Sequence, residues 1–113
     1  MAWRPSALLD AGTSVAVAST TTLLSGPHDV VGGQVCGIAL TNQDASQTLE
    51  AWVEVSADGA TWEAKAWSGL SAIAPNSMRY DGFSVSFEKK IRVRGTASGA
   101  GLTANIYMEL FTE

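Results

Sequence analysis

The sequence predicts an all-β domain built as an antiparallel two-sheet sandwich, of jelly-roll or immunoglobulin-like type, with seven or eight strands. Four stretches alternate apolar and other residues with the two-residue period of a half-buried strand: Gln47–Ser56, Asp81–Phe87, Lys90–Thr96 and Leu102–Phe111. Turn signals bound each stretch, and no ten-residue window keeps the apolar spacing of an amphipathic helix. The Cys, Trp, Cys framework of a true immunoglobulin domain is absent, because the chain has one cysteine.

The chain of 113 residues is long enough for one domain with a single core. We expect residues 1–12 to form an extended N-terminal arm and residues 13–113 to form the sandwich. The segment Met1–Pro5 lacks the apolar core of a signal peptide, so we expect no secretion signal. The lone Cys36 is expected in the interior of a strand.

The first half of the chain predicts two or three strands. Ser14–Leu24 is rich in Val and Thr and forms one or two of them, and the segment Gly26–Asp29 then turns the chain. Gly33–Thr41 is uncharged on both faces and is therefore placed centrally in a sheet. Gln34, Cys36, Ile38 and Leu40 are predicted to share one of its faces, and Val35, Gly37 and Ala39 the other.

The next hairpin turns at an Asp-Gly dipeptide, and its loop length decides which residues face each other. A two-residue loop would place Glu54 opposite Glu63, which is unfavourable for like charges. We therefore favour a four-residue loop, Ser56–Gly59, which places Trp62 opposite Val53 on the core face.

Ser68–Ser77 is expected to cross between strands, with Leu70 and Ile73 as apolar anchors and a turn at Pro75-Asn76. Met78–Tyr80 extends the chain at a sheet edge. A charged turn at residues 88–90 leads into the next strand, and residues 97–101 close the final hairpin. The predicted core contains Val53, Val55, Trp62, Phe83, Val85, Ile91, Val93, Ile106 and Met108.

The chain carries few charges, and this argues against nucleic acid as a partner. Charged residues make up 16% of the chain, and the net charge is −4. A mildly acidic surface is repelled by phosphate backbones. Apolar runs are also too short for a membrane helix, so we expect neither a nucleic-acid nor a membrane partner.

Residues for catalysis are scarce. His28 is the only histidine, and no nucleophile motif accompanies it, so we interpret it as part of a solvated turn. Asp10 and Asp29 near it lack metal-ligand spacing. The carboxylates Glu50, Glu54 and Glu63 are expected on one solvated strand face rather than as an acid–base pair. We therefore expect no enzyme activity, no cofactor and no metal.

Aromatic and arginine side chains that point away from the predicted core are the candidate interface. We expect one sheet face to carry Trp52, Trp67, Tyr107 and Phe111 together with Arg92 and Arg94. Trp3 and Arg4, at the N-terminus, are further candidates for the interface. Such residues are typical of protein interfaces and of sugar-stacking platforms. They would instead be core if the Ser68–Ser77 crossing or the N-terminal arm covered them.

The pattern Leu49–Trp62, with its Ser-x-Asp-Gly-x-Thr-Trp element, followed by Lys90–Thr96 and a closing alternating strand, resembles small β-sandwich proteins of tailed-bacteriophage particles. The resemblance covers residues 47–111. It implies a virion-located structural protein, specifically a capsid decoration (cement) protein that forms a homotrimer and contacts the major capsid protein or another virion protein. The alternatives are a neck, tail or head-fibre component, or a carbohydrate-binding module for host adsorption.

Overall fold

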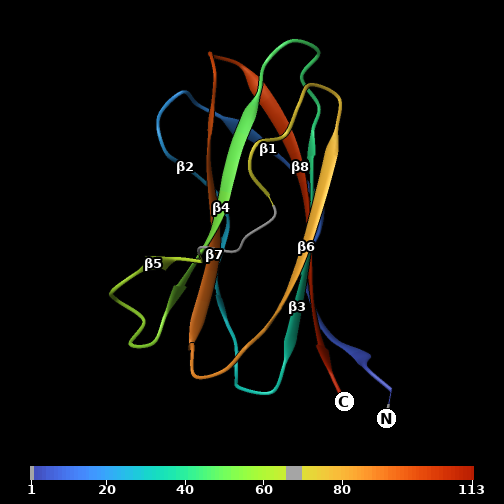
Figure 1. The fold of residues 1–113 in the computed structure, drawn as a ribbon, viewed down its shortest axis with the longest axis vertical. Coiled ribbons are helices and arrows are strands. Elements are labelled where there is room, and N and C mark those ends of the chain that lie inside the picture. Colours follow the sequence, from blue (N-terminus) through green and yellow to red (C-terminus); the bar gives the residue numbers. More distant parts are fainter. Residues whose placement is uncertain (1, 66–69) are drawn as a thin grey trace.

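The computed structural model describes residues 2–65 and 70–113. Its described part is all-β, with two four-stranded sheets packed face to face (Figure 1). One sheet has the order β1-β8-β3-β6 and the other β2-β7-β4-β5, and all pairings are antiparallel. The strands are β1 Arg4–Val17, β2 Thr22–Asp29, β3 Val35–Asn42, β4 Leu49–Ser56, β5 Glu63–Ala64, β6 Met78–Ser84, β7 Lys90–Ala97 and β8 Leu102–Thr112. This confirms the predicted two-sheet sandwich.

The predicted alternation is confirmed in the inner strands. In β3, β7 and β8, every second residue is buried, because successive side chains of a strand point to opposite faces. β3 lies between β8 and β6, as expected for a strand that carries no charge on either face. Met78 begins the edge strand β6, which ends at Ser84 rather than at Phe87.

The N-terminal segment lies in a sheet. Residues 1–12 were expected to form an arm outside the sandwich, but β1 starts at Arg4 and pairs along β8 from Arg4↔Thr112 to Val17↔Leu102. Three register shifts interrupt this ladder, and Gly12 has a φ of 82°. Such bulges add residues without breaking the pairing, which is why the segment lacks the regular alternation of a strand.

The segment Gly26–Asp29 is not the predicted turn. It belongs to β2, which pairs with β7 from Thr22↔Gly95 to Asp29↔Lys90 with two register shifts. Gly26 has a φ of 105°, and a Cβ there would lie 2.9 Å from the Ile91 carbonyl oxygen. Glycine and proline therefore mark a bulge in an edge strand at this position, which is one of their recognised roles in sheets.

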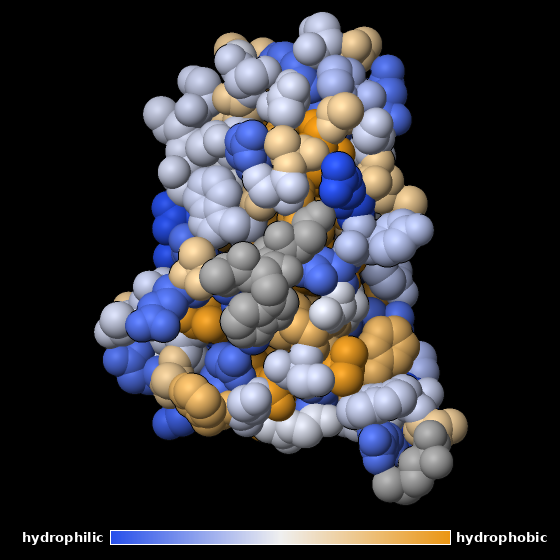
Figure 2. All heavy atoms as spheres, viewed as in Figure 1, coloured by the Kyte–Doolittle hydropathy of each residue, from blue (hydrophilic) through white to orange (hydrophobic). Residues whose placement is uncertain are grey.

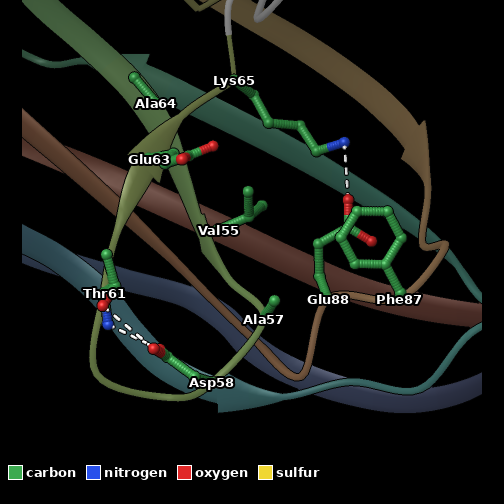
Figure 3. Close-up of a pocket in the computed structure, with 9 residues that line it drawn as sticks. All are labelled: Val55, Ala57, Asp58, Thr61, Glu63, Ala64, Lys65, Phe87 and Glu88. Carbon is green, nitrogen blue, oxygen red and sulfur yellow. Dashed lines mark hydrogen bonds and ion pairs between the residues drawn. The ribbon is translucent and has the colours of Figure 1, made fainter.

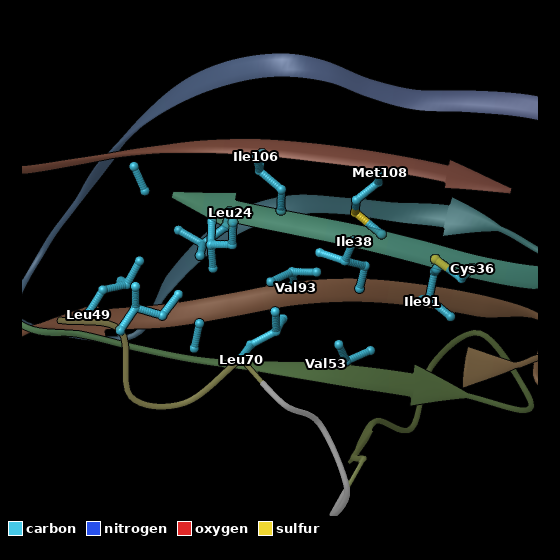
Figure 4. Close-up of a cluster of buried hydrophobic side chains, with 14 of the residues drawn as sticks. Leu24, Cys36, Ile38, Leu49, Val53, Leu70, Ile91, Val93, Ile106 and Met108 are labelled. Atoms are coloured by element: carbon cyan, nitrogen blue, oxygen red, sulfur yellow. The ribbon is translucent and has the colours of Figure 1, made fainter. Parts of the chain in front are cut away.

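The core lies between the two sheets (Figure 4), and the face drawn in Figure 2 shows strongly apolar residues only in patches between hydrophilic and near-neutral ones. Seven of the nine predicted core residues are buried there: Val53, Phe83, Val85, Ile91, Val93, Ile106 and Met108. Val55 is half-buried and packs against this cluster. The anchors Leu70 and Ile73 are fully buried, so their predicted role in the crossing is confirmed.

Trp62 is only half-buried, and its prediction as a core residue is wrong. The hairpin pairs Glu54↔Ala64 and Val55↔Glu63, so neither register considered above is the real one. Asp58 explains the longer loop. Its carboxylate accepts hydrogen bonds from the backbone N–H groups of Ala60 and Thr61 at 2.8 and 2.7 Å. These bonds hold residues 58–61 in the loop, so the returning strand β5 begins only at Glu63.

The connection at residues 97–101 also differs from its prediction. It joins β7 to β8, but these strands lie in different sheets, so the segment is a crossing and not a hairpin turn. This crossing decides where the candidate interface residues lie.

Candidate functional site

The structure separates the predicted interface residues into two groups. Trp52, Arg92 and Arg94 lie on β4 and β7, in one sheet, whereas Tyr107 and Phe111 lie on β8, in the other. The expectation of one shared face is therefore wrong, and the cause is the crossing between β7 and β8. Trp67, which was predicted to join them, lies outside the described residues.

On the first face, Glu54 organises its neighbours. Arg92 Nε donates to Glu54 Oε1 at 2.7 Å, Arg94 Nη1 donates to the same oxygen at 3.3 Å, and Trp52 Nε1 donates to Oε2 at 2.9 Å. Burial by itself raises the pKa of Glu54, but these hydrogen bonds and the two positive charges outweigh it and hold the pKa below its ordinary value. The carboxylate is therefore ionised, and both of its oxygens already accept hydrogen bonds within the protein.

The partners of Glu54 are held in place by this network. Trp52, Arg92 and Arg94 are all half-buried. The guanidinium of Arg92 also lies over the ring of Trp62, 4.1 Å from its centroid. Trp52, Arg92 and Arg94 are thus bound to Glu54, and Arg92 also to Trp62, so they form an ordered polar layer over the sheet rather than a row of free aromatic rings.

The second face, which we call the tyrosine face, is more exposed. Ala39 of β3 pairs with Tyr80 of β6 on one side and with Tyr107 of β8 on the other, so the three side chains form one row across the sheet. Tyr80 is 74% exposed and Tyr107 is 40% exposed.

The rest of the tyrosine face is also largely apolar. The ring of Phe111 lies over Gly37, with Cε1 3.4 Å from the position that a Cβ would occupy. Leu8 and Met78, from the two edge strands, are about half exposed. Glu109 also lies on this face, and its Oε1 accepts a hydrogen bond from the hydroxyl of Tyr107 at 2.9 Å. That bond, together with burial and the negative charge, raises the pKa of Tyr107.

Trp3 and Arg4 lie at the start of this sheet. Trp3 is 48% exposed and precedes β1, and Arg4 pairs with Thr112 at the end of β8. Sequence reasoning singled out these two residues but missed Tyr80 and Met78. The edge position of β6 was predicted. The pairing of Tyr80 with Ala39 could not be predicted, because it depends on which strand lies beside β6 in the sheet.

His28 lies in a small polar cluster that the sequence did not reveal. Its Nε2 lies 2.6 Å from Ser25 Oγ and 3.5 Å from Asp10 Oδ2, and Ser25 donates a hydrogen bond to the same Asp10 oxygen. His28 is thus half-buried in a strand, not in the solvated turn that was predicted. The cluster links β1 to β2, the neighbouring edges of the two sheets.

This cluster does not have the geometry of a catalytic triad. A triad needs the serine on one ring nitrogen and the carboxylate on the other, but Ser25 and Asp10 both approach Nε2 of His28. Ser25 gives its only proton to Asp10, so that proton is not available to the imidazole. Asp29, the other predicted neighbour, pairs instead with Lys90 Nζ at 2.6 Å.

Within residues 2–65 and 70–113, no group of three or more His, Cys, Asp and Glu side chains is arranged to hold a metal ion. The three glutamates considered above also do not act as a set. Glu54 is occupied by arginine, and Glu50 accepts a hydrogen bond from the hydroxyl of Ser71. Glu63 faces a separate pocket beside β5.

No helix in the described part of the chain has the length and apolar character needed to cross a membrane.

Comparison with known proteins supports the fold. No family model matches the chain, and no curated protein matches it. Among solved structures, the chain is similar to a protein of Bacillus endospore appendages, which are described as a novel family of disulfide-linked pili. The similarity has a TM-score of 0.52 at 14% sequence identity, and it covers 96% of this chain and 92% of that one. At this identity, the likeness shows a shared β-sandwich architecture over nearly the whole chain.

Proposed function

We propose that the protein is a non-catalytic structural subunit that acts through contacts with other protein subunits in a multi-copy assembly. The observation that carries this proposal is the tyrosine face. It exposes Leu8, Met78, Tyr80 and Tyr107 around the small residues of β3, and its outward positions carry little charge. Apolar and aromatic surface with few charges is typical of the centre of a protein interface.

The finer proposal is that the assembly is a phage particle and that the protein is a capsid decoration protein. Its support is the resemblance of residues 47–111 to small β-sandwich virion proteins. In this role, a homotrimer binds the major capsid protein or another virion protein. Binding many copies to the assembled shell stabilises it, because the assembled form is bound and its dissociated subunits are not.

A second candidate is a subunit of a filament, and the similarity to an endospore appendage protein favours it. Disulfide linkage of the kind described for those pili does not transfer through Cys36. This residue is the only cysteine of the chain, and it is fully buried in β3. A filament of this chain would therefore be held by contacts other than a disulfide through Cys36.

The experiment that separates these candidates is electron microscopy of the purified protein, alone and mixed with capsids that lack it. A decoration protein binds the capsids as regularly spaced copies and forms only small closed oligomers alone. A filament subunit forms open polymers without capsids. A protein that stays monomeric alone and binds no capsids would contradict both candidates.

A further inference from the structure

A pocket beside β5 is separate from both sheet faces described above. It has a volume of about 450 Å³ and lies between the loop at Ala57–Thr61, the short strand β5 and the connection at Phe87–Glu88 (Figure 3). Pockets of a few hundred cubic ångströms are large enough to bury a side chain with its neighbouring backbone.

The pocket is lined by more negative than positive charge. Three carboxylates, from Asp58, Glu63 and Glu88, face one ammonium group, from Lys65. Lys65 Nζ lies 3.3 Å from Glu88 Oε1, and the two side chains are only 5% and 11% exposed. The Lys65 ammonium also lies 4.7 Å from the centroid of Phe83. The deep end of the pocket thus already holds a cation between a carboxylate and an aromatic ring.

The outer part of the pocket keeps two carboxylates. Asp58 is ionised, because hydrogen bonds from Thr61 and Ala60 hold its pKa far below the ordinary value. Its oxygens are directed at the loop, and it acts on the pocket through its charge. Glu63 is exposed at the rim and is the carboxylate best placed to meet an incoming group.

The wall opposite the loop supplies apolar contact. The ring of Phe87 is 78% exposed and stands at the pocket, next to Glu88 (Figure 3). Val55 and Ala64 add further apolar surface. An exposed phenyl ring beside carboxylates matches a group that combines a cation with a hydrocarbon stem.

We propose that this pocket binds an arginine side chain carried by a partner protein, with the guanidinium paired to Glu63 and stacked on Phe87. Arginine fits better than lysine, since its planar guanidinium stacks on rings and pairs with carboxylates at the same time. The Arg92 contacts with Trp62 and Glu54 show the same combination within this protein. The inference rests on the proposed function, because it names the chemistry of one contact of the subunit.

The test is an NMR titration of the isotopically labelled protein with N-acetyl-arginine amide. The matched probe is N-acetyl-citrulline amide, which has the same shape without the charge. We expect saturable shifts of the backbone amides of residues 57–65 and 87–88 with the arginine probe. Glu63→Gln and Phe87→Ala should each weaken this binding about threefold to tenfold, whereas Glu113→Gln, which removes an exposed carboxylate outside the pocket, should leave it unchanged.

Equal shifts with the citrulline probe would overturn the proposal, as would arginine shifts spread over all acidic surfaces or no saturable shifts at all. The spectra also report whether each variant is folded. The titration does not depend on assembly. A chain that assembles but does not bind arginine refutes the pocket alone, and a chain that binds arginine but never associates refutes the structural role.

Discussion

The guanidinium carbon of Arg92 lies 4.1 Å from the centroid of the Trp62 ring. Arg92 belongs to β7, and Trp62 ends the long loop before β5. The contact therefore fastens that loop to the outer surface of the sheet, and it explains why Trp62 is half-buried without entering the core.

This position predicts a modest effect of Trp62→Ala. The substitution removes one cation–π contact and part of a buried ring, so we expect a loss of about 1–2 kcal/mol in the free energy of unfolding. Leu49→Ala, in the fully buried core, is the comparison and should cost about 2–5 kcal/mol. Urea denaturation measures both losses, and a larger loss for Trp62→Ala than for Leu49→Ala would place the indole in the core.

Glu54 should contribute stability that depends on pH. Its pKa in the folded protein is below the ordinary value of 4.5, so its contribution is complete above that value and is lost as the pH falls through the lower, folded pKa. We expect Glu54→Gln to cost about 1–3 kcal/mol at neutral pH. The difference between the two proteins should shrink in acid, and a difference that stays constant down to pH ~2 would contradict the assigned network.

Asn42 should be essential for the connection that contains Ile73. Its buried amide nitrogen donates to the carbonyl oxygens of Gln47, Ile73 and Ala74 at 2.8, 3.1 and 3.3 Å. Asn42→Asp places a carboxylate against these oxygens, and we expect a loss of about 2–4 kcal/mol. Asn105→Asp is the matched control, since its amide bonds Gly12 at an exposed position, and it should cost about 1 kcal/mol or less. Equal losses, measured by thermal unfolding, would show that burial is not the cause.

The thiol of Cys36 should react very slowly with thiol reagents in the folded protein. Burial, and to a smaller extent the charge of Asp81, raise the pKa of its thiol to about 12, and the side chain is fully buried. A thiol-specific chromogenic reagent at pH ~8 should therefore react slowly with the native chain and fast after addition of denaturant. Rapid reaction of the native protein would mean that β3 opens readily.

The strands were predictable where one face is buried, and not elsewhere. Leu102 to Leu110 alternate because β8 covers the core on one side and has an outer face on the other. β1 lies at an edge with three bulges, so most of its residues are exposed and no periodic pattern marks it. The register of the β4–β5 hairpin was missed because the side chain of Asp58, not the Asp-Gly dipeptide, sets the loop length.

The candidate surfaces were only partly predictable for a related reason. Sequence alternation shows that Arg92 and Tyr107 point away from the core, but not that their strands belong to different sheets. The pairs Ala39↔Tyr80 and Ala39↔Tyr107 depend on strand order, which a single sequence does not contain. The same holds for the cluster of Asp10 and His28, whose strands meet at the edges of the sandwich.

The proposed function depends on subunit contacts made by the tyrosine face. Sedimentation velocity over a wide concentration range, with and without capsids that lack the protein, tests this most directly. We predict oligomers or capsid binding for the unchanged chain, with clear weakening when Tyr80→Ser and Tyr107→Ser are combined and no change for Thr103→Ser on the same sheet. A monomer at every concentration that also fails to bind capsids, or unchanged association of the double variant, would contradict the claim.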